Sequence, residues 1–403
     1  MFIALPRILV YVAFLFLPFT FIRLYSNLNI SDVLIIISFL IIIISNTGKR
    51  FLLDTVLLNN IFLVPMLIFS LGFLLSLNMS LLPYESITAY LQVLFIFMFA
   101  YPALERIIID EKQIRTIAVM LIVPGVIISI LMIMLKIFSI DIGIDLLATE
   151  GWRGRLSYGG MEPSVPGRII LQNIPFLAIF SLTTKSKTIK TFSVILILIN
   201  ILAILLTSSR SNFLTFILGS ILFLIFLIKF GTKIRIRSVV FITLITAIML
   251  VITHHFNNEY FIRPFERYST ILNIDKSPSS LERLKVIDKG FNYINKNPFI
   301  GLGMGNSYLY TKTSLHNPIL LAWVENGIFG IIGFACFYFI LLLQGIRCYM
   351  NKFYGSYMLL GLTVVMVMMI FGDMFMANSY KRVLWLPAMI MMVNYNILRN
   401  QAK

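Results

Sequence analysis

Long apolar blocks, separated by short polar segments, run along almost the whole chain. Each block holds about 20 residues, the length that an α-helix needs to cross a hydrocarbon core of about 30 Å. The blocks predict twelve membrane spans, near residues 8–22, 31–46, 57–77, 87–104, 116–138, 168–183, 190–207, 212–229, 238–254, 318–346, 356–373 and 382–398. The tenth block is long and contains Asn326 and Gly327, which predicts a short helix before a full span. No cleavage site follows the first block, so we interpret it as a retained helix.

The composition supports an all-α integral membrane protein that forms one polytopic domain over residues 1–403. Only 12% of the residues are charged, against roughly 25% in soluble domains. The chain therefore has too little polar surface to cover itself in water. Its net charge is +16. We ascribe this charge to cytoplasmic loops, where Lys and Arg accumulate in membrane proteins, and not to a nucleic-acid partner.

The distribution of basic residues predicts the orientation of the spans. With the N-terminus in the cytoplasm, the cytoplasmic segments carry seventeen of the Lys and Arg residues and the four short outer loops carry four. Two longer outer loops, 139–167 and 255–317, are largely exempt from this rule because long segments translocate regardless of charge. We therefore expect both termini in the cytoplasm and both long loops on the opposite side.

The large loop before the tenth span, residues 255–317, contains a predicted amphipathic helix. Ser279 and Glu282 have the spacing of a capping box. Apolar residues then recur at helical spacing and predict one apolar face, made of Leu281, Leu284, Ile287, Phe291 and Ile294. Asn297-Pro298 ends the helix. We expect this helix to lie on the outer membrane face or to pack over the bundle.

Polar residues just before the tenth span are the first candidates for chemistry. Asn317 can cap a helix whose first residue is Pro318. His316 then lies at a positive helix end, which favours the neutral imidazole that accepts a proton. Such a group suits a general base for a sugar hydroxyl. The alternative is an interfacial histidine that only helps to start a helix.

Arginines near the outer loops are candidates for binding an anion. Arg210 follows Ser209 in a very short turn, and Arg283 lies in the first turn of the amphipathic helix. Arginine binds phosphate oxygens in a bidentate manner, and the first turn of a helix already favours an anion. The alternatives are an interfacial arginine and an ordinary solvated charge.

A second polar group precedes the sixth span and contains Arg153, Arg155 and Glu162, leading to Arg168. Asp373, Lys381 and Arg382 flank the last outer loop and are candidates for the same cavity. The alternative is a polar loop made of turn residues.

Other kinds of site receive no support. The adjacent His254 and His255 point apart on a helix and make a poor metal chelate. The glycines of the 301–305 segment lack the spacing of a nucleotide-binding loop. We therefore expect neither a metal nor another cofactor.

Taken together, the polar motifs resemble the O-antigen polymerase and O-antigen ligase superfamily of bacterial envelope glycosyltransferases. In chain order they are Ser209-Arg210, Ser280-Leu281-Glu282-Arg283, Asn297-Pro298-Phe299-Ile300-Gly301-Leu302-Gly303, and His316-Asn317 followed nine residues later by Gly327, with Glu325 before the glycine. Each motif alone is weak, but the set in this order on a twelve-span frame is specific. The resemblance covers roughly residues 150–335.

The resemblance implies a fold similar to the type C glycosyltransferases and a site on the periplasmic side of the bacterial inner membrane. Donor and acceptor would be polyprenyl pyrophosphate-linked oligosaccharides, and no metal would be needed. Carried onto matching positions, Arg210 and Arg283 would hold the donor pyrophosphate. His316 would deprotonate or orient the acceptor hydroxyl, and transfer would invert the anomeric carbon. Asn317 and Glu325 would belong to the same substrate-binding set, with Arg153, Arg155 and Glu162.

Three functions remain open at this point. The segment Met161-Glu162-Pro163-Ser164 resembles one seen in many polymerases, which favours an O-antigen polymerase, and a polymerase would be expected to have a chain-length regulator as its partner. An O-antigen ligase would instead transfer the glycan to lipid A–core. A lipid-linked oligosaccharide flippase is the alternative from another class, although the two halves of the chain show no similarity to each other.

Overall fold

The computed structural model describes residues 4–19, 23–25, 28–45, 60–138, 162, 164–231, 268, 278–375 and 382–402. Regular structure within these residues is helical apart from two short antiparallel strands, β1 (Arg23–Tyr25) and β2 (Leu28–Asn29). The helices are α1 (Ala4–Phe16), α2 (Ile30–Ile44), α4 (Leu63–Leu77), α5 (Pro83–Leu94), α6 (Tyr101–Ile107), α7 (Glu111–Phe138), α8 (Ser164–Thr183), α9 (Lys187–Leu206), α10 (Arg210–Phe230), α13 (Pro278–Lys296), α14 (Ser307–Thr311), α15 (Pro318–Met350), α16 (Tyr357–Asp373) and α17 (Arg382–Gln401). A π-helical segment, Phe95–Ala100, joins α5 to α6.

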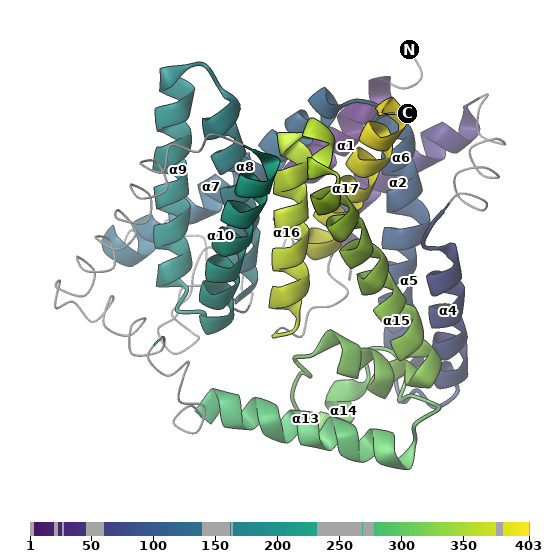
Figure 1. Ribbon diagram of the computed structural model, residues 1–403. Coiled ribbons are helices and arrows are strands. Elements are labelled where there is room, and N and C mark those ends of the chain that lie inside the picture. Colours follow the sequence, from purple (N-terminus) through teal and green to yellow (C-terminus); the bar gives the residue numbers. More distant parts are fainter. Residues whose placement is uncertain are drawn as a thin grey trace.

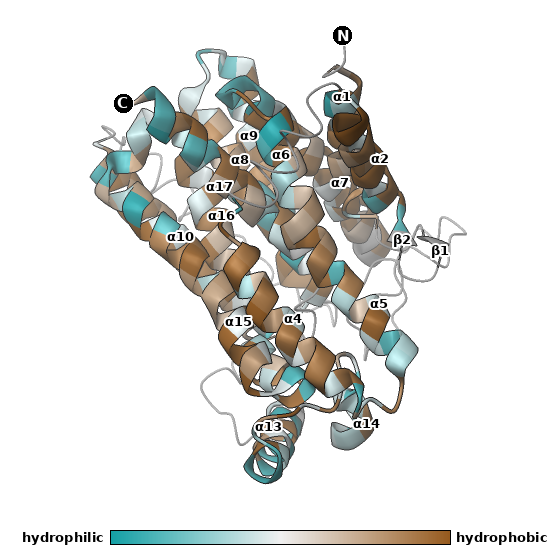
Figure 2. Ribbon diagram, turned by 90° about the vertical axis from the view of Figure 1, so that its right-hand side faces the viewer, coloured by the Kyte–Doolittle hydropathy of each residue, from teal (hydrophilic) through white to brown (hydrophobic). Residues whose placement is uncertain are grey.

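The long apolar helices lie side by side in one bundle, and α13 crosses beneath it (Figure 1). Both chain termini lie at the end of the bundle away from α13 (Figure 1). Apolar residues cover most of the length of the bundle helices, whereas α13 is largely hydrophilic (Figure 2). This distribution is the one expected of a bundle whose sides face lipid and whose ends face water.

Six of the described helices are long and apolar enough to cross a membrane. They include the continuous segment Pro83–Ile107, in which α5 and α6 join end to end. Four shorter apolar helices, α1, α2, α4 and α16, have between 10 and 17 residues, fewer than the roughly 20 that span a bilayer without thinning or help from neighbours. The helical fold is therefore confirmed, whereas the count of twelve spans is not and stays a prediction. The predicted ninth span, 238–254, lies outside the described residues.

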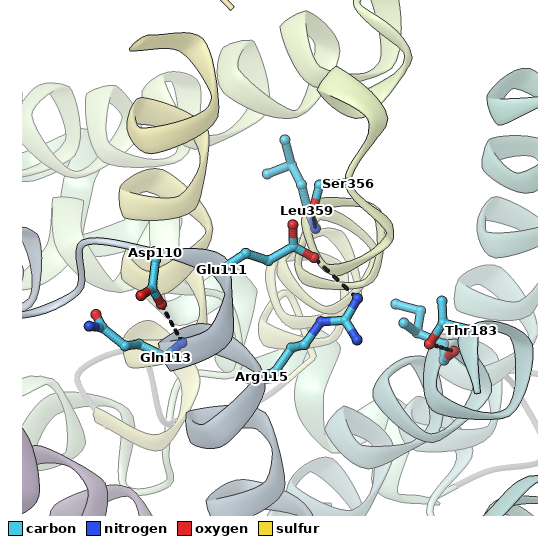
Figure 3. Close-up of polar contacts among 8 residues, drawn as sticks. Asp110, Glu111, Gln113, Arg115, Thr183, Ser356 and Leu359 are labelled. Carbon is cyan, nitrogen blue, oxygen red and sulfur yellow. Dashed lines mark hydrogen bonds and ion pairs between the residues drawn. The ribbon is translucent and has the colours of Figure 1, made fainter. Parts of the chain in front are cut away.

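Polar side chains cap several helices at the end of the bundle that carries the termini (Figure 3). Asp110 caps α7, because its carboxylate accepts the backbone N–H of Gln113 at 2.8 Å. One turn later, Arg115 and Glu111 form an ion pair at 3.5 Å. The hydroxyl of Ser356 caps α16 in the same way as Asp110 caps α7.

The helix that corresponds to the tenth predicted span is broken, as its sequence predicts. The backbone of α15 is not helical at Gly327, where φ is 66° and ψ is −160°. Beside the break, the N–H groups of Leu302 and Gly303 donate to the carbonyls of Val324 and Glu325 at 2.9 and 3.0 Å. The preceding loop therefore supplies donors that the interrupted helix does not supply itself.

Glycines allow this loop and the break to approach closely. A Cβ at Gly301 would lie 2.1 Å from the carbonyl oxygen of Glu325, and one at Gly327 would lie 2.1 Å from the carbonyl oxygen of Phe299. The backbone of the Asn-Pro motif therefore touches the backbone at the α15 break. This close contact explains why glycine is needed at both Gly301 and Gly327.

The amphipathic helix α13 packs over the start of α15. Its buried stripe contains Val286, Gly290 and Ile294, and it contacts Leu315 and Leu320. Of the two locations that we expected for this helix, packing over the bundle is therefore confirmed.

Two details of the α13 prediction were wrong. Leu281, Leu284 and Phe291, which we expected on the buried face, are exposed. Gly290 allows α13 to approach the bundle closely. The stripe that contains Val286, Gly290 and Ile294 therefore faces the bundle. The helix also begins at Pro278, one residue before the expected cap Ser279, because proline is suited to the first turn of a helix.

We expect Gly327→Ala to destabilise the protein by more than about 2 kcal/mol, because it combines a positive φ with a clash against backbone. The matched control is Gly355→Ala, since Gly355 also has a positive φ (76°) but has nothing within 4 Å of a Cβ. The melting temperature of the detergent-solubilised protein measures both. Equal losses in the two variants would contradict the role of the close contact.

Candidate functional site

Four segments that are distant in the sequence meet around one histidine at the end of the bundle near α13. They are the residues that precede and begin α8, the second turn of α13, the loop before α15 and the residues that follow α16. Figure 1 shows α13 and the lower ends of α10 and α16 at this end. The side chains that carry the arrangement are charged, so electrostatics governs their protonation.

His316 lies at the centre of this group. Burial lowers the pKa of its imidazole below the ordinary value of 6.5, and the charge of Arg283 lowers it further. Glu162 and Glu282 oppose the shift, as does the backbone of Phe375. The lowered pKa favours the neutral imidazole that we expected, but its causes are burial and the charge of Arg283, whereas we had considered only the positive end of the helix.

The Nδ1 atom of His316 is buried and has no hydrogen-bond partner among the described residues. A neutral imidazole has one nitrogen with a lone pair that can accept a proton.

Asn317 has the capping role that the sequence predicts. Its Oδ1 accepts the backbone N–H groups of Ile319 and Leu320, each at 3.0 Å, and Pro318 is the first residue of α15. These bonds fix the direction in which the chain enters α15, and so fix the position of the preceding His316. A direct contact of Asn317 with substrate stays a prediction.

Arg283 and Glu162 lie close enough to the imidazole and to each other for their charges to interact. Burial lowers the pKa of the Arg283 guanidinium, and the charges of Glu162 and Glu282 partly restore it. Glu162 also interacts with His316 and with Arg168. The structure thus brings together three of the residues that we selected from the sequence, namely His316, Arg283 and Glu162.

Arg210 is the first residue of α10, after the N-cap Ser209. The turn that precedes it is buried and includes Ser208 with a positive φ of 51°. Two residues further, Asn212 donates to the carbonyl of Ser164 at 3.0 Å, which binds the start of α10 to the start of α8. Arg210 therefore lies at the same end of the bundle as Glu162, beside the first turn of α8.

Glu325 is buried and holds α14 against α15. Its carboxylate accepts the hydroxyl of Ser307 at 2.7 Å and the backbone N–H of the same residue at 3.4 Å. These contacts account for its burial, and a role in substrate binding stays a prediction. Arg153 and Arg155 lie outside the described residues.

We expected Arg168 and Asp373 near this cavity but assigned neither of them a role in it. Arg168 is completely buried near the start of α8, and its charge interacts with Asp373 and Glu162. Tyr338, from the middle of α15, donates to Asp373 at 2.5 Å. The sequence feature that could have identified them is a charged residue within an apolar span. Such a residue is costly in lipid and is therefore a candidate for a functional role.

Residues 194–335 match the model of the O-antigen ligase family. The match confirms the resemblance to the O-antigen polymerase and ligase superfamily. It includes Arg210, Arg283, His316, Asn317 and Glu325, and it ends just after the Gly327 break. No curated protein matches the chain. Together with the apolar helices, the family match supports a bacterial membrane protein of O-antigen ligase or polymerase type, and it does not distinguish between the two.

Among the described residues, no three His, Cys, Asp or Glu side chains come together as a group that holds a metal ion. The charges that face the imidazole are those of one arginine and two carboxylates. Arginine side chains and the first turns of α10 and α13 are among the positive groups available to an anion at this end of the bundle.

We expect the imidazole of His316 to titrate below 6.5. Arg283→Gln should raise its pKa because a repelling positive charge is removed, and Glu162→Gln should lower it because an attracting negative charge is removed. Histidine ¹⁵N NMR of the detergent-solubilised protein measures this titration, with His254→Gln and His255→Gln used to assign the signals. Shifts of the same sign in both variants would contradict the proposed arrangement of charges.

Proposed function

We propose that this protein is an O-antigen polymerase, which transfers a growing glycan from polyprenyl pyrophosphate to a new lipid-linked repeat unit on the periplasmic side of the inner membrane. The observation that carries the proposal is the neutral imidazole of His316, with an unpartnered Nδ1, beside the cationic Arg283. A proton acceptor next to a cation is the pair of functions that an inverting transfer from a pyrophosphate donor requires.

In the proposed reaction, Nδ1 of His316 takes the proton of the acceptor hydroxyl. The hydroxyl oxygen attacks the anomeric carbon of the donor, and the bond from that carbon to the pyrophosphate oxygen breaks on the opposite face, which inverts the configuration. The electron pair of the broken bond leaves with the lipid pyrophosphate. Arg210 and Arg283 offset the charge that develops there, so the reaction needs no metal.

Burial of the imidazole supports this reaction in a second way. A protonated histidine cannot act as the base, and a positive arginine nearby keeps the imidazole unprotonated near pH 7. The same arginine that binds the donor thus keeps the base in its active form. We therefore expect the transfer rate to fall as the pH decreases through the pKa of His316.

The placement of basic residues supports an outward-facing site. Lys185, Lys187, Arg347 and Lys352 lie in or beside the connections α8–α9 and α15–α16, at the end of the bundle that carries the termini (Figure 1). The positive-inside rule assigns this end to the cytoplasm. The end with His316 would then face the periplasm, where lipid-linked repeat units are polymerised in our proposal.

A ligase is the second candidate, because the matching family carries that description. It would use the same donor and the same base, and it would differ in the acceptor, lipid A–core. The E-P-S segment at Glu162 favours the polymerase. A chain-length regulator as partner follows from the polymerase proposal alone.

The function is tested by gel banding of lipopolysaccharide from a strain in which His316→Ala is the only copy. A polymerase predicts core with a single repeat unit and no ladder above it. A ligase predicts bare core while polymer accumulates on the polyprenyl carrier. His254→Ala, expressed at the same level, is the control. A normal ladder from His316→Ala would contradict the catalytic assignment, and a normal ladder without the protein would favour the transporter alternative.

We expect Arg210→Lys and Arg283→Lys each to reduce chain formation at least about tenfold, because lysine keeps the charge and loses the bidentate geometry. Densitometry of the ladder at equal protein levels measures the loss. Arg115→Lys is the matched control, since Arg115 forms a half-exposed ion pair at the other end of the bundle. Full activity of both site variants would argue against binding of pyrophosphate by these arginines.

A further inference from the structure

The glycine-rich loop before α14 contacts a second part of the bundle, the turn between α4 and α5. A Cβ at Gly303, where φ is 92°, would lie 2.5 Å from the Cβ of Ser80 in that turn. The same glycine donates its N–H to the carbonyl of Glu325 beside the α15 break. The loop therefore lies between the α4–α5 turn on one side and α15 on the other.

Asn306 holds this loop to the α4–α5 turn. Its side chain is buried, with 1% exposure. Its Oδ1 accepts the backbone N–H of Leu82 at 3.1 Å, and its Nδ2 donates to the hydroxyls of Ser80 and Ser86 at 3.0 and 2.7 Å. One amide thus binds three residues that lie more than 200 positions earlier in the sequence.

Ser86, in the first turn of α5, completes this connection. Its hydroxyl donates to the carbonyl of Met304 at 2.8 Å, and it also contacts the hydroxyl of Ser80 at 2.8 Å. We call the group of Ser80, Leu82, Ser86, Met304 and Asn306 the Asn306 junction. Buried hydrogen bonds of this kind are costly to break, because the partner that remains is left unsatisfied.

The junction continues to the residues that carry the site. Ser307 follows it directly and donates its hydroxyl to the carboxylate of Glu325 at 2.7 Å. Glu325 belongs to the short helix that precedes the α15 break, residues 318–326. This short helix begins at the cap Asn317, which follows His316. Hydrogen bonds and short backbone segments therefore connect the α4–α5 turn to the imidazole.

The short helix takes its orientation from contacts with other elements, because the backbone at Gly327 is not helical. Apolar side chains of α13 pack on it, and Ser76 of α4 donates to Asn326 over 3.4 Å. Apolar contacts are non-directional. The shorter hydrogen bonds of the Asn306 junction and of Glu325 are therefore the contacts that fix its tilt.

A small tilt at the break would be amplified at His316. The nine residues 318–326 form a helix about 13 Å long, so a tilt of about 5° moves its far end by about 1 Å. A misplacement of about 1 Å at a reacting group can cost about a hundredfold in rate. The position of the imidazole therefore depends on how firmly the other end of the short helix is held.

We propose that Asn306 is a positioning residue for His316, which fixes the tilt of the short helix relative to α4 and α5. Its significance for catalysis rests on the proposed function, in which His316 is the base. Asn306 acts only through the contacts of the junction and not on the reacting atoms. The surface that it binds, the α4–α5 turn, lies outside the residues 194–335 that match the family.

The test is the distance between α5 and the loop before α15, measured by double electron–electron resonance on spin-labelled full-length protein. The labels are attached at Leu91→Cys on α5 and at Ser314→Cys, both exposed positions, in a background with Cys336→Ser and Cys348→Ser. The protein with an intact junction should give one narrow distance distribution. Asn306→Ala should broaden it, because the short helix is no longer held at one tilt.

Asn60→Ala is the matched control. Asn60 is also a buried asparagine next to α4, and it donates to the carbonyl of Phe97 and accepts the N–H of Phe62, each at 3.0 Å. Its replacement should lower the melting temperature, as Asn306→Ala does. It should leave the distance distribution narrow, because these bonds lie outside the junction.

Ser86→Ala is a smaller change that decides by the same criterion if Asn306→Ala does not fold. It removes one partner of Asn306 and leaves the amide in place. Its control is Ser129→Ala on α7, because the Ser129 hydroxyl is also buried and also has two contacts, with Gly125 at 2.9 Å and Asn200 at 3.1 Å.

A narrow, wild-type distribution in the folded variants of Asn306 and Ser86 would overturn the proposal, as would equal broadening in the two controls. Transfer activity provides the second readout, in which kcat should fall at least about tenfold in Asn306→Ala and stay within about twofold of wild type in Asn60→Ala. An unchanged kcat beside a broadened distribution would also overturn the role in positioning. The distance measurement needs no substrate, so its result stands even if His316→Ala shows the proposed function to be wrong.

Discussion

The arrangement of the site depends on the break in α15 and on the backbone that satisfies it. A helix in lipid must pair its own carbonyls, and an interruption is tolerated only where other groups replace the lost donors. Here the replacement comes from Leu302 and Gly303, which bind the carbonyls of Val324 and Glu325. The pairing anchors the outer loop to the start of α15, and this start carries the Asn317 cap and His316.

The charges near His316 alternate in sign across separate elements. Asp373 faces Arg168, Arg168 faces Glu162, and Glu162 faces both Arg283 and His316. Each buried charge thus has an opposite charge nearby, which reduces the cost of its burial. The uncharged member of the series is the imidazole. A series of this kind can hold a base in its neutral form and still offer positive charge to an anionic leaving group.

The family match and the geometry support the same class of function from different directions. The match concerns residues 194–335 and carries the description O-antigen ligase. The electrostatics adds that Glu162, which lies outside this segment, interacts with the matched His316 and Arg283.

The grouping of His316 with Arg283 was implied by the family resemblance. Local patterns in the sequence were sufficient for the helical fold, the cap at Asn317 and the short helix before Gly327. Each follows from a signal that lies within a few residues: an apolar block, a capping residue before proline, or a glycine in a long helix. The same signals placed α13 over the bundle but wrongly assigned Leu281, Leu284 and Phe291 to its buried stripe, because the packing of Gly290 against Leu315 and Leu320 involves a separate segment.

The tertiary structure decided what the local patterns leave open. Arg168 and Asp373 are more than 200 positions apart, and no periodicity relates an arginine near the start of α8 to an aspartate at the end of α16. Glu325 and Ser307 are joined only because the loop folds back onto the α15 break. The sequence by itself determined which segments form long apolar helices and which polar residues lie at their ends. Only the packing of the helices decided which of these polar residues meet, because burial and charge pairing depend on contacts between distant elements.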